Sequence, residues 1–187
     1  VHRLDQDTSG VMIFALSERA YLELKKMFEQ HLLTRAYTAI IQGRLASIKG
    51  TWQSYLIEDD NYVVYETSDT RAGRLAITHY DTIKKKKNYS ALCLTLETGR
   101  KNQIRVHCQS AKHPIIGDKK YGSTVNPIKR LGLHAHLLAF DHPITNKKMH
   151  FESPLPKEFK KLDLYREQSS CKYRSGFKTL SGYLFLA

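Results

Sequence analysis

The fold of this chain is decided by two polar segments, HRLDQDTSG at residues 2–10 and TGRKNQIRVH at residues 98–107. Each segment combines arginine and histidine with small or turn-forming residues and runs directly into an apolar stretch. Asp5 lies just before the apolar run at residues 11–16. A carboxylate close to an arginine at the edge of a buried element is a candidate catalytic group with a shifted pKa. The alternative is an ordinary loop salt bridge between Arg3 and Asp5, which is the better interpretation of an isolated segment.

Composition indicates a basic, globular protein. The 187 residues fit one domain and are enough to bury a core. No apolar run approaches the roughly 20 residues that cross a bilayer, and no signal peptide opens the sequence. The 30 Lys and Arg against 18 Asp and Glu give a net charge of +12. This balance favours a polyanionic partner, because each neutralised phosphate releases condensed counterions. A merely basic surface is the alternative; an anionic membrane surface lacks the amphipathic basic helix that would support it.

Cysteine usage bears on the compartment. Cys93, Cys108 and Cys171 are odd in number and widely spaced, with no C-x-x-C pair. Such usage predicts reduced thiols in a cytosol-like compartment, so we expect a cytoplasmic protein. Cys93 falls in an alternating strand pattern and is expected to be a small core residue.

Residue periodicity predicts many strands and few helices. Ser17 fits the N-cap of a helix that would run to about Leu33. Its buried stripe would consist of Tyr21, Leu24, Phe28 and Leu32. Strand patterns occur at residues 37–42, 62–67, 76–83, 90–98, 133–140 and 144–151, and further helices at 102–112 and from Pro156 to about Arg166. The pattern predicts an α+β protein with a mixed sheet.

Three more motifs accompany the two segments: RAYTAIIQG at 35–43, KHPIIGDKKYG at 112–122, and LHA at 133–135 running to FDHP at 140–143. All five, in this order, resemble the RluA-type pseudouridine synthases, which modify ribosomal and transfer RNA. The resemblance covers roughly residues 1–165. It implies a mixed, largely antiparallel β-sheet with flanking helices and a central cleft. It also implies an isomerase that converts uridine in structured rRNA or tRNA to pseudouridine, without a cofactor.

The resemblance implies roles for three residues. Asp5, matching the aspartate of H-R-L-D, would be the catalytic nucleophile or base; an N-cap or Asx-turn is the alternative. Whether it attacks the sugar, attacks the uracil ring or abstracts a proton stays open. Tyr37 would stack on the uracil ring, unless it is a buried strand tyrosine. Arg105 would pair with Asp5 and keep that carboxylate ionised and aimed, unless it contacts phosphate or solvent.

Four further residues are placed by the same resemblance. Arg3 would contact the RNA where the target base leaves the stack. Arg100 would touch the backbone phosphates. Leu133 would give the pocket an apolar wall. Asn102 departs from the family pattern, which usually has histidine there, and we expect it to tune the site without disabling it.

Other classes of protein are less well supported. The nine histidines include no compact set at the spacings of zinc sites, so we expect no metal. Ser9 lies outside any G-x-S-x-G motif, which disfavours a serine hydrolase. Asp5 and Asp7 are too close in sequence for an inverting glycosidase pair. A non-catalytic RNA-binding module that retains the fold is the main alternative to the enzyme.

The domain organisation follows from where the motifs lie. Residues 1–167 are expected to form the catalytic domain, N-terminally incomplete because the first motif begins at His2. Residues 168–187 match nothing in the family pattern and are expected to be a C-terminal tail, in which residues 183–186 could add a strand. We expect a monomer whose partner is RNA and which does not associate with membranes.

Overall fold

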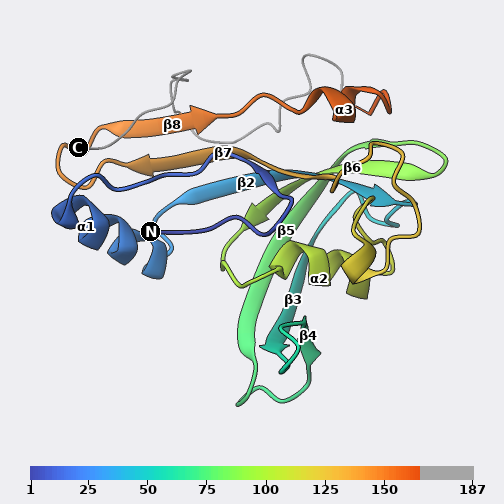
Figure 1. Ribbon diagram of the computed structural model, residues 1–187, viewed down its shortest axis with the longest axis horizontal. Coiled ribbons are helices and arrows are strands. Elements are labelled where there is room, and N and C mark those ends of the chain that lie inside the picture. Colours follow the sequence, from blue (N-terminus) through green and yellow to red (C-terminus); the bar gives the residue numbers. More distant parts are fainter. Residues whose placement is uncertain (165–187) are drawn as a thin grey trace.

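The computed structural model describes residues 1–164 of the chain and is drawn as a ribbon in Figure 1. Three predictions fall outside the described residues: the helix end near Arg166, the thiol of Cys171 and the added strand at residues 183–186.

The described residues contain one sheet of eight strands, in the order β1-β7-β2-β6-β5-β3-β4, with β8 also pairing with β7. All strand pairs are antiparallel except the pair of β1 with β7. The mixed, largely antiparallel sheet is therefore confirmed. The strands are β1 (Ser9–Gly10), β2 (Thr34–Gln42), β3 (Lys49–Glu58), β4 (Val64–Thr67), β5 (Arg74–Lys85), β6 (Tyr89–Leu96), β7 (Leu133–Asp141) and β8 (Lys148–Glu152).

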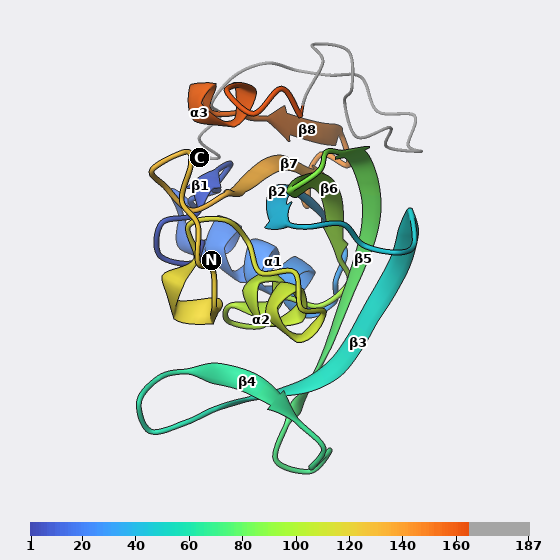
Figure 2. The ribbon, with the colours of Figure 1, turned by 90° about the vertical axis from the view of Figure 1, so that its right-hand side faces the viewer.

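Helices cover both faces of this sheet. They are α1 (Glu18–Glu29), α2 (Gln103–Ser110), the 3₁₀ turn η1 (Lys119–Tyr121) and α3 (Lys157–Lys160). Figures 1 and 2 show α1 and α2 on the same face and α3 on the other. The long strands β3 and β5 extend past α2 and carry β4 at their far end, as an arm (Figure 2).

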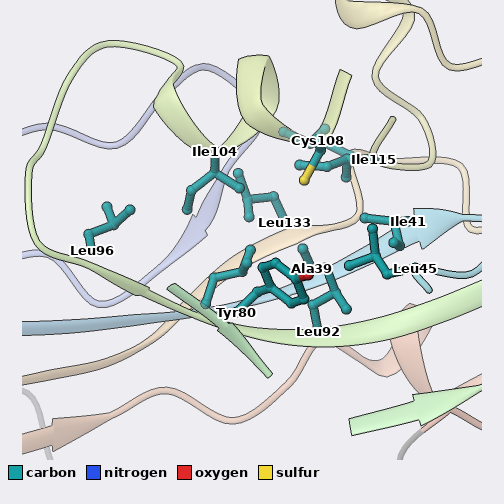
Figure 3. Close-up of a cluster of buried hydrophobic side chains, with 12 residues drawn as sticks. Ala39, Ile41, Leu45, Tyr80, Leu92, Leu96, Ile104, Cys108, Ile115 and Leu133 are labelled. Atoms are coloured by element: carbon teal, nitrogen blue, oxygen red, sulfur yellow. The ribbon is translucent and has the colours of Figure 1, made fainter. Parts of the chain in front are cut away.

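The core under α2 is formed by the alternation of the central strands. Figure 3 shows Ile104 and Cys108 of α2 above Ala39 of β2 and Leu92 of β6. Leu92, Leu94 and Leu96 alternate along β6, which lies in the predicted strand at 90–98, and all three are buried.

The opposite face of the same strands is buried as well. Ile40 and Ala91, which are paired across β2 and β6, pack with Phe159 of α3. Because both faces of β2 and β6 are covered, these two strands form the rigid centre on which the loops at the strand ends are mounted.

The predicted helix after Ser17 is present, but it is shorter and turned from the expected orientation. The Ser17 side chain accepts a hydrogen bond from Ala20 N (3.2 Å), which confirms the N-cap. The buried residues are Ala20, Leu24 and Met27, whereas Tyr21 is 44% exposed. Adjacent helix faces both carry apolar residues, so periodicity alone did not select the packed one. The helix ends at Glu29, and Leu32 beyond it is 59% exposed.

Strand β3 was missed because its sequence does not look like a core strand. Its burial alternates between exposed and partly buried, with Leu56 as its one buried residue. It is held by its pairing with β5, an interaction to which composition gives no signal. The strand predicted at 144–151 begins later, at Lys148, and pairs with β7. The helix predicted at 102–112 spans Gln103–Ser110.

The prediction of reduced thiols holds only in part. Cys108 is a free thiol and fully buried, and burial raises its pKa. Cys93 is buried as expected, but it is disulfide-bonded, so the expectation of a reduced thiol is wrong for this residue. Within residues 1–164, no helix has both the length and the apolar character needed to span a bilayer.

Candidate active site

Asp5 lies in a loop whose far end is fixed by strand β1. Thr8 N donates to Asp5 O (3.0 Å), closing a turn in which Asp7 adopts a left-handed backbone (φ 66°). β1 lies so close to β7 that a Cβ on Gly10, at φ 131°, would be 2.1 Å from the Ala135 carbonyl oxygen. Glycine is required at position 10, and this close pairing determines where the Asp5 loop ends.

The near end of the loop is held by His2. Its Nε2 accepts a hydrogen bond from Ile13 N (3.0 Å), and its ring stacks on Phe28 of α1 with centroids 4.7 Å apart. Burial lowers the pKa of His2 to about 4, so the ring is neutral at physiological pH and can act as an acceptor. The segment that carries Asp5 is therefore attached at both ends.

A cavity of about 490 Å³ opens beside Asp5. This volume lies within the range typical of small-molecule sites. The lining combines carboxylates with an excess of cations and contains one leucine: Arg3, Asp5, Gln6, Asp7, Tyr62, Lys101, Asn102, Arg105, Gly117, Asp118, Lys119, Lys120 and Leu131.

The carboxylate of Asp5 is held from the loop that precedes α2. Asn102 N donates to Asp5 Oδ1 (3.2 Å), and Asn102 adopts a left-handed backbone at φ 54° as the N-cap of α2. Burial raises the pKa of Asp5, while the Asn102 hydrogen bond and the charges of Arg105 and Arg3 oppose this rise. Asp5 is thus a half-buried carboxylate with a raised pKa, which fits a group that exchanges protons or attacks a substrate.

Arg105 does not form the predicted ion pair with Asp5. Its Nε and Nη2 each lie 2.7 Å from an oxygen of Asp118, and its Nη1 donates to Asn102 Oδ1 (3.0 Å). Burial by itself would lower the pKa of Arg105, but the hydrogen bonds and charge of Asp118 raise it. Arg105 therefore does pair with a carboxylate, through two hydrogen bonds, but that carboxylate belongs to Asp118 and not to Asp5. Arg105 reaches Asp5 through its charge and through Asn102, which it holds in place.

Asp118 belongs to the motif at residues 112–122, but the sequence alone predicted no role for it. Its side chain is 0% exposed, and it caps η1 by accepting from Tyr121 N (3.3 Å). The Arg105 guanidinium lies 4.7 Å from the centroid of the Tyr121 ring. Tyr121 Oη in turn accepts from Val64 N (3.4 Å) of β4. This chain of contacts joins α2, η1 and the arm around the cavity.

Two buried polar residues of α2 attach the helix to the sheet. Gln103 accepts from Thr98 Oγ1 (2.8 Å) and Arg100 N (2.9 Å), and its Nε2 donates to Thr78 Oγ1 (2.9 Å) on β5. His107 Nδ1 lies 2.9 Å from the same Thr78 oxygen, and burial lowers the pKa of His107 to about 4. These contacts fix the start of α2, and hence the Asn102 N–H that faces Asp5.

Comparison with known proteins fits this arrangement. The sequence model of the family described as RNA pseudouridylate synthase matches residues 1–110. The chain belongs to this family. It is 38% identical over 162 residues to the uncharacterized RNA pseudouridine synthase YjbO of Bacillus subtilis, covering 87% of this chain and 57% of that protein. It is 36% identical over 181 residues to ribosomal large subunit pseudouridine synthase D of Pasteurella multocida, covering 87% and 54%.

A solved structure confirms the pseudouridine synthase fold. Human RNA pseudouridylate synthase domain containing 1 superposes with a TM-score of 0.72 at 24% identity, covering 83% of this chain and 68% of that one. The chain spans little more than half the length of the curated relatives it matches.

Within this pseudouridylate synthase fold, Tyr37 lies close to Asp5 but does not line the cavity. It is partly buried on β2 and packs against the core under α2. Burial raises the pKa of Tyr37 to about 12, the charge of Arg35 opposes this, and the charge of Asp5 adds to it. The phenol therefore stays protonated at physiological pH and can donate a hydrogen bond.

The remaining predicted residues are distributed between rim, neighbouring surface and core. Arg3 is exposed on the cavity rim. Arg100 donates to Leu75 O (2.9 Å) and lines a separate cavity of about 380 Å³. Leu133 is 1% exposed inside the core, whereas Leu131 is the leucine that lines the Asp5 cavity. In the chain up to residue 164, no three His, Cys, Asp or Glu side chains are grouped to hold a metal.

Proposed function

We propose that this chain is the catalytic region of an RNA pseudouridine synthase, in which Asp5 is the catalytic carboxylate. The observation that carries the proposal is the position of Asp5, half-buried and hydrogen-bonded by Asn102 N, in a cavity that has room for a nucleobase and has a cationic rim. Family membership supplies the reaction, and the cavity offers a single carboxylate that is neither exposed nor fully paired.

The reaction is an isomerisation, so uridine and pseudouridine have the same composition. The bond between N1 of uracil and C1′ of ribose breaks, the base rotates, and a bond forms between C5 and C1′. The hydrogen on C5 leaves to solvent, and N1 gains a proton. No electron acceptor and no group donor enters this balance. Asp5 would serve as the nucleophile or base, and the low-dielectric cavity would strengthen its interaction with the substrate.

The neighbouring residues support this chemistry in distinct ways. The Asn102 N–H aims the Asp5 carboxylate, and Arg105 holds Asn102 through its side-chain oxygen. Tyr37, with its protonated phenol near Asp5, would stack on the flipped uracil. The cations on the rim, among them Arg3, would contact the phosphates of the RNA backbone. Arg100, on the neighbouring surface, would extend this contact.

The finer assignment concerns substrate and setting. We propose structured RNA as the substrate, ribosomal or transfer, because the net charge is +12 and one relative is named for the large ribosomal subunit. Residues 1–167 would be the catalytic domain, acting as a monomer in the cytoplasm, where ribosomal and transfer RNA are found.

Hydrogen release from C5 tests the enzyme directly. RNA labelled with tritium at uridine C5 is incubated with the protein, and the label appearing in water is counted. We expect release with the wild type and none with Asp5→Asn, because an amide keeps the size of the carboxylate but not its charge. RNA affinity should persist in that variant. Asp7→Asn is the matched control, since Asp7 is an exposed carboxylate of the same loop, and it should retain most activity.

The contrary outcomes are distinct. Equal release by wild type and Asp5→Asn would refute the catalytic assignment. Loss of RNA binding together with activity would make Asp5 a structural residue of the loop. RNA binding without release by any version, a full-length protein included, would favour the non-catalytic RNA-binding module.

A further inference from the structure

We infer that Tyr62 is a stacking platform for a nucleotide that flanks the target uridine, an inference that rests on the proposed function. Tyr62 lies in the loop between β3 and β4, at the end of the arm, and its ring reaches the rim of the Asp5 cavity. The residue is 72% exposed, the highest value of any Phe, Tyr or Trp within residues 1–164. The packing of the domain therefore gives no reason for an aromatic residue here.

The loop that presents this ring is held by several hydrogen bonds. The Asp59 carboxylate accepts from Asn61 N (3.0 Å) and Val63 N (2.7 Å). Tyr62 N donates to Asp59 O (3.0 Å), and Lys120 Nζ donates to Tyr62 O (3.1 Å). The exposed ring is thus positioned before any ligand arrives, which reduces the entropy lost on binding.

The backbone at Tyr62 is unusual for an aromatic residue. Its φ is 59°, a left-handed conformation that asparagine and aspartate adopt far more readily than bulky residues. An asparagine, such as the adjacent Asn61, would adopt this backbone conformation more readily than the tyrosine that is found here. Backbone strain that the fold does not explain is found preferentially at functional sites.

The surroundings of the ring are those of a single-stranded nucleic acid site. Lys101 Nζ lies 5.3 Å from the centroid of the Tyr62 ring and is paired with Glu58. Lys119 and Lys120 line the same cavity and are exposed. An aromatic face beside cations binds single strands because the base stacks on the ring while the cations contact phosphates.

The position of the ring decides which nucleotide it receives. The target uridine must enter the cavity to reach Asp5. Tyr62 is at the rim, on the path of the strand that enters and leaves. Flipping a nucleotide leaves its neighbour without a stacking partner. A fixed ring at the rim replaces that lost stacking and so lowers the cost of flipping.

The test uses hairpin RNAs whose loop uridine is flanked by 2-aminopurine on its 5′ or its 3′ side. This base analogue loses fluorescence when it stacks on an aromatic ring. We expect quenching at one of the two positions with the wild type and with Tyr62→Phe, which keeps the ring. Tyr62→Leu should abolish the quenching and weaken binding about tenfold. The matched control is Tyr65→Leu, because Tyr65 is 45% exposed on β4 and lines neither cavity; it should behave as wild type.

Each alternative result has a definite meaning. Unchanged quenching and affinity in Tyr62→Leu would overturn the inference, as would equal losses in Tyr62→Phe and Tyr62→Leu, which would assign the effect to the hydroxyl. Failure of the wild type to bind either hairpin would overturn it too and would point to a protein partner for this loop. The C5 tritium assay separates the two proposals. Tritium release by the wild type, together with unchanged quenching and affinity in Tyr62→Leu, refutes only the stacking platform. Quenching that depends on Tyr62, without any tritium release, refutes only the enzyme.

Discussion

The inner wall and the rim of the cavity both carry charge, but they use it in opposite ways. The inner wall is defined here as Arg105 and Asp118, whose side chains are 10% and 0% exposed and are joined by two hydrogen bonds of 2.7 Å. The rim is defined as the exposed residues Arg3, Lys119 and Lys120. Desolvated, paired charges fix geometry, whereas solvated cations remain available for phosphate. Whether a charge is buried or exposed to water therefore decides whether it maintains the structure or is available to bind RNA.

The largest expected effect is a loss of stability when the ion pair of the inner wall is broken. Asp118→Asn leaves the Arg105 charge buried without its partner, and the free energy of unfolding should fall by about 3–5 kcal/mol. Urea unfolding followed by circular dichroism measures this. The control is Glu58→Gln, which removes the partly exposed pair with Lys101 and should cost under about 1 kcal/mol. Similar losses in the two variants would contradict the distinction between wall and surface.

The second largest effect is expected for Arg105→Lys, although this substitution preserves the charge. Lysine cannot form both bonds to Asp118 and also hold Asn102, so the Asn102 N–H should lose its aim at Asp5. We expect the rate of C5 tritium release to fall at least about tenfold, with a loss of roughly 1–3 kcal/mol in the free energy of unfolding. Arg71→Lys, at a side chain 94% exposed, is the control. Activity near wild type in Arg105→Lys would make Arg105 dispensable for the site.

The rim should affect binding without affecting stability. Replacing both Lys119 and Lys120 by glutamine should flatten the dependence of log K on log salt concentration by about 1.4, because each lost phosphate contact to a single strand contributes about 0.7. Kd for a hairpin RNA is measured across a salt series. Lys25 and Lys26, exposed on α1 and away from the cavity, are replaced in the control. An unchanged slope in the rim variant would place the RNA elsewhere.

The smallest effect is a change of stability at Asp5 itself. Because the pKa of Asp5 is raised on folding, the folded state holds this proton more tightly than the unfolded state does. The free energy of unfolding therefore falls as pH rises from the pKa of Asp5 in the unfolded state to its higher pKa in the folded state. Asp5→Asn should be slightly more stable than wild type at neutral pH, and the difference should vanish in acid. Chemical unfolding at both pH values measures it; a destabilised variant at neutral pH would instead indicate a structural Asx-turn.

The fold was predictable where local pattern and tertiary packing agree. Leu92, Leu94 and Leu96 alternate and are all buried, and Ser17 caps α1 as its residue type suggests. The prediction failed where only a distant partner makes the element, as in β3, whose polar surface is held by β5. It also failed where two helix faces were both apolar, so that Met27 rather than Tyr21 was buried.

The sequence by itself determined that this chain is an α+β pseudouridine synthase domain and that Asp5 and Arg105 belong to one site, because both stand in ordered motifs. Only the tertiary structure decided that Arg105 pairs with Asp118 and that Asn102 N reaches Asp5. It also decided that Leu131 lines the Asp5 cavity while Leu133 is buried in the core. A hydrogen bond requires its atoms within about 3 Å and in line. Spacing along the sequence sets residue types and elements, but such distances arise only when separate elements pack and exclude water.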